Sequence, residues 1–108
     1  LPAVIVISST AGIYAKGSNI IYSAMKSAVN SLVISSCQWM KKDQKVISLC
    51  PGLLKGGMTE DAPNLYKEHW KNIYKKGELP NDIDIGEKVK EILFNDAIKT
   101  GSIIELNF

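Results

Sequence analysis

Three runs of apolar residues predict three β-strands. The first is Val4 to Ile7, the second is Val46 to Cys50, and the third is Ser102 to Leu106. The first two are almost uninterrupted, and such runs are typical of strands covered on both faces, as in a parallel sheet flanked by helices. Pro51-Gly52 ends the second run and Thr100-Gly101 precedes the third, so both junctions carry turn residues.

Two segments with helical periodicity follow the first and second strands. The longer begins at Ser18 or Asn19, either of which is a suitable N-cap, and extends to about Met40. The shorter begins with a capping box of Asp84 and Glu87 and extends to about residue 95. Its apolar positions are Val89, Ile92, Leu93 and Phe94. Strand, helix and strand in this order predict a right-handed βαβ unit, and hence an α/β fold with parallel strands.

The segment from Leu53 to Asn81 differs in character from its surroundings. Aromatic and apolar residues at helical spacing are Tyr66, Trp70, Ile73 and Tyr74. They predict a short amphipathic helix, which leaves two interpretations open. Either the helix simply packs one face on the body of the protein, or residues 53–81 form a mobile, lid-like substrate loop with hinges at Gly56-Gly57 and Gly77.

Composition limits the possible function classes. Of 108 residues, 45% are hydrophobic and 22% are charged, which fits one globular domain or part of one. The 13 basic and 11 acidic residues are interspersed, so nothing in the charge indicates binding to nucleic acid or to a membrane. Cys37 and Cys50 are expected to be reduced thiols, and His69 has no neighbouring ligand for a metal. We therefore expect a cytoplasmic protein without a metal site.

The first predicted strand has no partner strand before it. Leu1 leads directly into the strand, without a methionine or a polar lead-in. An apolar strand at an open sheet edge is a template for aggregation, which soluble proteins normally cover. We therefore expect further strands on the N-terminal side of Leu1, with the 108 residues forming the C-terminal part of one larger domain.

Candidate chemistry centres on Tyr22 and Lys26. Residues four apart on a helix lie on one face, so the phenol and the ammonium can point into the same site. A cation near a tyrosine favours the phenolate and lowers the pKa of the phenol, which suits acid/base work near neutral pH. Ser9 follows the first strand, at the edge where open α/β sheets place their ligands. A hydroxyl there can hold a substrate carbonyl.

Four ordered motifs resemble the C-terminal half of the short-chain dehydrogenase/reductase family. They are Val6-Ile7-Ser8-Ser9, Tyr22-Ser23-Ala24-Met25-Lys26 in the form YxxxK, Val46 to Gly52, and Thr100 to Ile104. The resemblance covers essentially the whole chain. It implies the C-terminal half of a Rossmann-like, doubly wound parallel sheet with the N-terminal half absent. It also implies NAD or NADP as the cofactor, a small-molecule alcohol or carbonyl as the substrate, and a homodimer or homotetramer.

The same resemblance assigns roles to individual residues. Tyr22 would be the general acid in carbonyl reduction and the base in alcohol oxidation. Lys26 would lower the pKa of Tyr22 and hold the nicotinamide ribose, and Ser9 would orient the substrate oxygen. Pro51, Gly52 and Leu54 would lie along the nicotinamide, with the Leu54 backbone at its carboxamide. Asn30 is not the asparagine of the family's catalytic tetrad, which belongs to an earlier helix.

Two departures from the family pattern bear on cofactor binding. The threonine that often lies five residues after the proline is replaced by Gly56. The glycine-rich turn that seats the pyrophosphate at a helix N-terminus is absent from these residues, and Gly56-Gly57 does not have its spacing.

Two other hypotheses remain beside an NAD(P)-dependent oxidoreductase. One is a non-catalytic protein that keeps the fold for subunit association through the long helix. The other is a truncated copy of 108 residues with neither fold nor activity.

Overall fold

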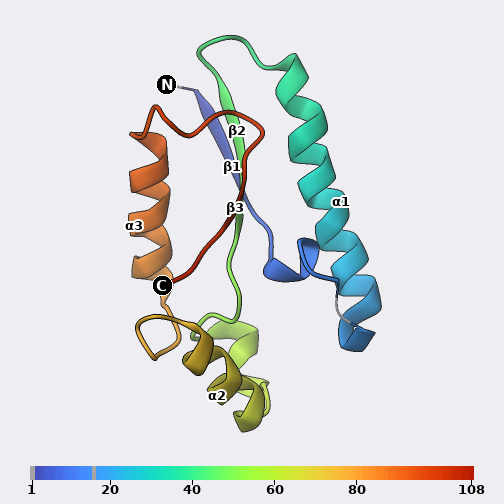
Figure 1. Ribbon diagram of the computed structural model, residues 1–108, viewed down its shortest axis with the longest axis vertical. Helices are drawn as coiled ribbons and strands as arrows, with labels where there is room; N and C mark the ends of the chain where they lie inside the picture. The colour runs from blue at the N-terminus through green and yellow to red at the C-terminus, as the bar shows by residue number, and fades with distance from the viewer. Residues whose placement is uncertain (1, 16) are drawn as a thin grey trace.

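The computed structural model describes residues 2–15 and 17–108, with the backbone alone for Ser18 and Met58. Within this part of the chain, three strands alternate with helices along the sequence (Figure 1). The strands are β1 (Ala3–Ile7), β2 (Lys45–Cys50) and β3 (Ile103–Glu105), and the α-helices are α1 (Ile20–Ser36), α2 (Asn64–Ile73) and α3 (Asp82–Leu93). Short 3-10 turns cover Thr10–Gly12, Gly17–Asn19, Cys37–Trp39 and Gly57–Asp61.

The strands form one parallel sheet in the order β1-β2-β3. Ala3 pairs with Lys45 and Ile7 with Leu49 along β1 and β2, and Ser48 pairs with Ile103 on β3. The predicted α/β fold with three parallel strands and flanking helices is therefore confirmed. Among the described residues β1 has a partner on one side only, so it is an edge strand of this sheet.

Helices cover both faces of the sheet, with α1 on one face and α3 on the other (Figure 1). Successive side chains of a strand point to opposite faces. Ile47 and Leu49 of β2 therefore face α3, where they form the core with Ile92 and Leu106. Ser48 and Cys50 face α1 instead, and both are fully buried. The uninterrupted apolar character of β2 follows from this two-sided burial.

The ends of the long helix differ slightly from the prediction. The α-helix begins at Ile20 and ends at Ser36, and a 3-10 turn continues it to Trp39. Asn19 occupies the N-cap position, but its side chain makes no capping hydrogen bond. The side chain of Ser18, the alternative cap, lies outside the described residues.

The predicted start of α3 was wrong by three residues. Asn81, not Asp84, is the N-cap, and Asp84 takes the N3 position that was assigned to Glu87. The Asn81 side chain accepts a hydrogen bond from the Asp84 backbone amide at 3.0 Å, and the Asp84 carboxylate accepts one from the Asn81 amide at 2.9 Å. Both sites fit a capping box by residue type, but Asn81 directly follows the buried Pro80 and so begins the helix earlier.

Ile73 and Phe94, two residues counted in the apolar patterns of the predicted helices, are exposed in the structure. Ile73 is 46% exposed at the end of α2, and Phe94 lies beyond α3 and is 80% exposed. Tyr74 is buried as expected, but it follows the end of α2 in an extended conformation. Both helices stop earlier than their apolar patterns do.

Two features of the described residues concern membranes and metals. Among them, no helix is long and apolar enough to cross a membrane, and no three His, Cys, Asp or Glu side chains converge as a metal site. Cys37 and Cys50 are both free thiols.

Candidate active site

The candidate site lies where the carboxyl ends of β1 and β2 meet the first turns of α1. Backbone hydrogen bonds tie the two strand ends together, from Ser8 N to Leu49 O at 2.7 Å and from Thr10 N to Pro51 O at 3.0 Å. Ser9 follows β1 in an extended conformation, and its Oγ accepts a hydrogen bond from Ala11 N at 3.1 Å. The hydroxyl is therefore fixed in place as an acceptor, and its proton can be donated to a ligand.

The start of α1 is held against this strand end by short contacts. Ser27 Oγ donates to Gly12 O at 3.1 Å, and Ser8 Oγ lies 3.4 Å from Lys26 O. A Cβ atom on Gly12 would lie 2.8 Å from the Lys26 carbonyl carbon, closer than side-chain contacts allow. Glycine is therefore required where the loop crosses the helix, and this close approach positions the first two turns of α1 beside Ser9.

A cavity of about 270 Å³ opens at this junction, and we call it the Tyr22 cavity. Ser9, Tyr22 and Gly52, three of the predicted site residues, line it. Its other lining residues are Thr10, Ala11, Asn19, Leu53, Tyr66 and Trp70. Lys26, Pro51 and Leu54, also predicted at the site, are not among its lining residues. Pro51 is buried and uses its carbonyl to bind the Thr10 amide.

Lys26 lies one turn along α1 from Tyr22. Its ammonium is 5.6 Å from the centre of the Tyr22 ring, which is within the range of a cation–π contact. Among the described residues no carboxylate forms an ion pair with Lys26. Tyr22 is 44% exposed and lines the cavity, so its side chain remains accessible.

Two aromatic residues of α2, Tyr66 and Trp70, form a wall of the cavity that sequence reasoning did not assign to the site. Trp70 is 7% exposed and packs directly on Gly52, where a Cβ atom would lie 2.1 Å from Trp70 Cζ3. Spacing by four had identified the helix and its aromatic face, but spacing alone gives no partner for Trp70. The absence of a side chain at Gly52, which leaves room for the Trp70 ring, is the feature of the sequence that could have indicated this contact.

Tyr74 anchors this wall to the strand end. Its hydroxyl donates to Leu53 O at 3.0 Å, and its ring centre is 5.6 Å from that of Trp70. Burial raises the pKa of Tyr74 from 10.0 to about 12. The phenol is therefore neutral and a hydrogen-bond donor at physiological pH.

Asn30 lies under α1 and away from the cavity. Its Oδ1 accepts hydrogen bonds from Ser48 Oγ at 2.7 Å and from Cys50 Sγ at 3.6 Å. These contacts join α1 to β2 through buried polar groups, which require such partners. They give Asn30 a role in the contact between α1 and the sheet.

Gly56 adopts a left-handed backbone conformation, with φ of 86°. Residues other than glycine rarely tolerate this conformation, and a β-branched threonine tolerates it worst. Glycine at position 56 therefore fits this backbone path, whereas a threonine would be strained there.

Comparison with known proteins shows which family and which solved structures this chain resembles. Residues 3–66 match the family model described as short chain dehydrogenase. Comparison with curated protein sequences gave no match.

Three solved structures illustrate the similarity in fold. The 3-hydroxyacyl-CoA dehydrogenase type-2 from Mycobacterium avium is 21% identical with a TM-score of 0.81, over 97% of this chain and 41% of that one. The structure of 4-hydroxyisoleucine dehydrogenase complexed with NADH is 21% identical with a TM-score of 0.80, over 97% of this chain and 45% of that one. The structure of ElxO with NADP bound is 20% identical with a TM-score of 0.77, over 97% of this chain and 44% of that one. The chain thus spans less than half the length of these structures.

Proposed function

Because the chain belongs to the short-chain dehydrogenase family, we propose that it carries the acid/base site of an NAD(P)-dependent oxidoreductase. The reaction would interconvert a hydroxyl and a carbonyl on a small molecule. The observation that carries the proposal is the cavity lined by both Ser9 and Tyr22, with the Lys26 ammonium against the Tyr22 ring. This placement supports a role for the three side chains in proton transfer to a carbonyl oxygen.

Each of the three has a distinct task in carbonyl reduction. Ser9 donates its hydroxyl proton in a hydrogen bond to the substrate oxygen, since its own oxygen already accepts from Ala11 N. Tyr22 transfers its phenolic proton to that oxygen, and in alcohol oxidation it accepts the proton back. The positive charge of Lys26, 5.6 Å from the ring centre, stabilises the phenolate that forms.

The residues also suit a dinucleotide cofactor, which supplies the hydride chemistry when bound. Lys26 is not engaged by a carboxylate among the described residues, so its ammonium can also donate to ribose hydroxyls. Gly52 belongs to the cavity wall, while Pro51 and Leu54 are assigned to the nicotinamide on the family pattern alone. The similar structures that hold NADH and NADP support either dinucleotide.

The aromatic wall is the part of the cavity that would contact the substrate. Tyr66 and Trp70 line the cavity, and their helix is flanked on both sides by glycines with left-handed backbone. The glycines with left-handed backbone are Gly56, Gly57 and Gly77, with φ of 86°, 56° and 71°. We assign residues 53–81 to a substrate loop on this basis, with its mobility as a prediction.

A second candidate function, subunit association without catalysis, is favoured by one observation on α1. Ile21, Met25 and Leu32 follow one another at helical spacing and are all exposed, on the side away from the sheet. A homodimer or homotetramer would cover this stripe, with or without catalysis.

Free thiols at both cysteines suit a cytoplasmic location.

Two measurements on the full-length protein separate these functions. The first follows the absorbance of NADH and of NADPH with a panel of ketones and aldehydes, and turnover with either cofactor is expected. The second is calorimetric titration with both dinucleotides. A protein that neither turns over any carbonyl nor binds either dinucleotide would overturn the proposed reaction and favour the association role.

A further inference from the structure

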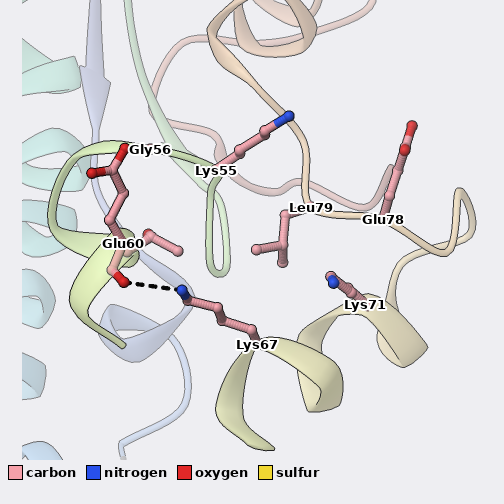
Figure 2. Close-up of a pocket in the computed structure, with 8 residues that line it drawn as sticks. Lys55, Gly56, Glu60, Lys67, Lys71, Glu78 and Leu79 are labelled. Carbon is pink, nitrogen blue, oxygen red and sulfur yellow. Dashed lines mark hydrogen bonds between the residues drawn. The ribbon is translucent and has the colours of Figure 1, made fainter. Parts of the chain in front are cut away.

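A second cavity in the described residues is separate from the Tyr22 cavity. It encloses about 420 Å³, a volume in the range of small-molecule sites. Its lining comes from the loop after β2, the 3-10 turn Gly57–Asp61, α2, and the loop before α3 (Figure 2). Lys55 N donates to Pro80 O at 2.8 Å, which joins the first and last of these segments. We call it the lysine cavity.

Three lysines contribute positive charge to this lining: Lys55, Lys67 and Lys71. Lys67 Nζ donates to the backbone carbonyl of Glu60 at 3.0 Å, which uses one of its three donors and leaves its charge unpaired (Figure 2). Among the described residues, Lys55 has no ion pair.

Among the described residues, Glu68 is the one carboxylate that forms an ion pair with any of these three lysines. Glu60 and Glu78 belong to the lining, but neither lies within ion-pair distance of a described lysine there, and Glu78 extends away from the other side chains in Figure 2. Lys71 pairs with Glu68 at 3.1 Å, in an exposed pair of the kind that contributes little to stability.

The placement of two lysines on α2 has an energetic consequence. Lys67 and Lys71 are four residues apart, and like charges at this spacing destabilise a helix. Because α2 has only 10 residues, it has few other turns to offset the repulsion. An anion between the two ammonium groups would convert this repulsion into attraction.

We propose that the lysine cavity binds an oxyanion, the phosphate or carboxylate group of a small-molecule ligand. Lys67 and Lys71 are its main donors, Lys55 adds a third positive charge, and the Thr59 hydroxyl can donate a hydrogen bond. Leu79 gives the same cavity an apolar surface for the uncharged part of the ligand. The inference does not depend on the proposed reaction, because Lys67 and Lys71 lie beside the aromatic wall and line no part of the Tyr22 cavity.

Titration of the 15N-labelled chain with inorganic phosphate at constant ionic strength tests this site. Saturable shifts are expected in the backbone amides of residues 55–60 and 67–71. Changing Lys67 or Lys71 to Met keeps the aliphatic stem and removes the charge, and roughly tenfold weaker phosphate binding is expected for each. Lys42→Met, which removes the same charge from an exposed turn, should bind phosphate like the original chain.

Two results would overturn the site. One is the absence of saturable shifts, and the other is an equal response of Lys67→Met and Lys42→Met. Lys67→Gln repeats the comparison should the Met variant lose its dispersed amide spectrum. Tyr22→Phe separates this site from the proposed reaction, since it should keep the phosphate response even where turnover is lost.

Competition then distinguishes the two sources of such a group. Displacement of phosphate by NADH or NADPH would assign the site to the cofactor's phosphates. Displacement by a sugar phosphate or a dicarboxylate, but not by the dinucleotides, would assign it to the substrate or to a separate effector.

Discussion

The contact between Gly52 and Trp70 gives the sharpest prediction about how the site is built. A Cβ atom on Gly52 would lie 2.1 Å from Trp70 Cζ3 and 2.5 Å from Cη2. Carbon atoms settle at roughly 3.5 Å or more, so in Gly52→Ala the ring must move by about 1.4 Å. Such overpacking typically costs about 1–3 kcal/mol of unfolding free energy, and complete expulsion of the ring costs more.

Urea unfolding of the 108-residue chain, followed by tryptophan fluorescence, measures this effect. Trp39 is 87% exposed, so a Trp39→Phe background leaves Trp70 as the sole reporter. Gly52→Ala should lower the unfolding free energy by about 1–3 kcal/mol and shift the native emission to the red. A cooperative transition in the parent would also contradict the interpretation as a truncated copy without a fold.

Gly17→Ala is the matched control, because a Cβ atom there meets nothing within 4 Å and the backbone is not left-handed. It should change the unfolding free energy by no more than about 0.5 kcal/mol. If Gly52→Ala is as stable as Gly17→Ala and keeps the blue emission of a buried indole, then Trp70 does not pack on Gly52, and the proposed cavity wall is wrong.

Two further predictions concern stability. Asn81→Ala removes the cap of α3 and should lower the unfolding free energy by about 0.5–2 kcal/mol in urea melts, whereas Asn81→Ser should keep most of it; equal loss in both would refute the capping box. Burial raises the pKa of Tyr74 to about 12, so the folded state binds its proton more tightly than the unfolded state does. Its stabilisation is therefore complete below pH 10 and declines as the pH rises from 10 to 12, by at most about 2 kcal/mol after solvent screening is allowed for. The slope of stability against pH in that window should be smaller in Tyr74→Phe, and an unchanged slope would contradict the assignment.

Local patterns in the sequence were enough to predict the framework of the fold. The apolar runs at β1 and β2, and the i, i+4 spacing of Tyr22 and Lys26, depend on periodicity within one element, and periodicity is visible in a sequence. Ser9 could be placed because the carboxyl ends of parallel strands share one edge of the sheet.

Contacts between distant residues could not be predicted in the same way. Trp70 on Gly52 joins residues 18 positions apart across a loop, and no repeat in the sequence pairs them. The lysine cavity depends likewise on how the segment after β2 folds back on the loop before α3. The choice between Asn81 and Asp84 as N-cap was a matter of register, because both residues have suitable side chains and a suitable residue three positions later.

The claim that Tyr22 is the acid/base residue is tested most directly by comparing two tyrosine variants. Each variant of the full-length protein would be assayed with its preferred dinucleotide and a carbonyl substrate from the panel. Tyr22→Phe should lower kcat/KM by about 10²–10⁴-fold, since it removes the proton donor and keeps the ring. Tyr14→Phe removes an exposed phenol that is bonded to Glu105 outside the Tyr22 cavity, and it should leave kcat/KM unchanged. Equal activity of the two variants would contradict the proposed role of Tyr22.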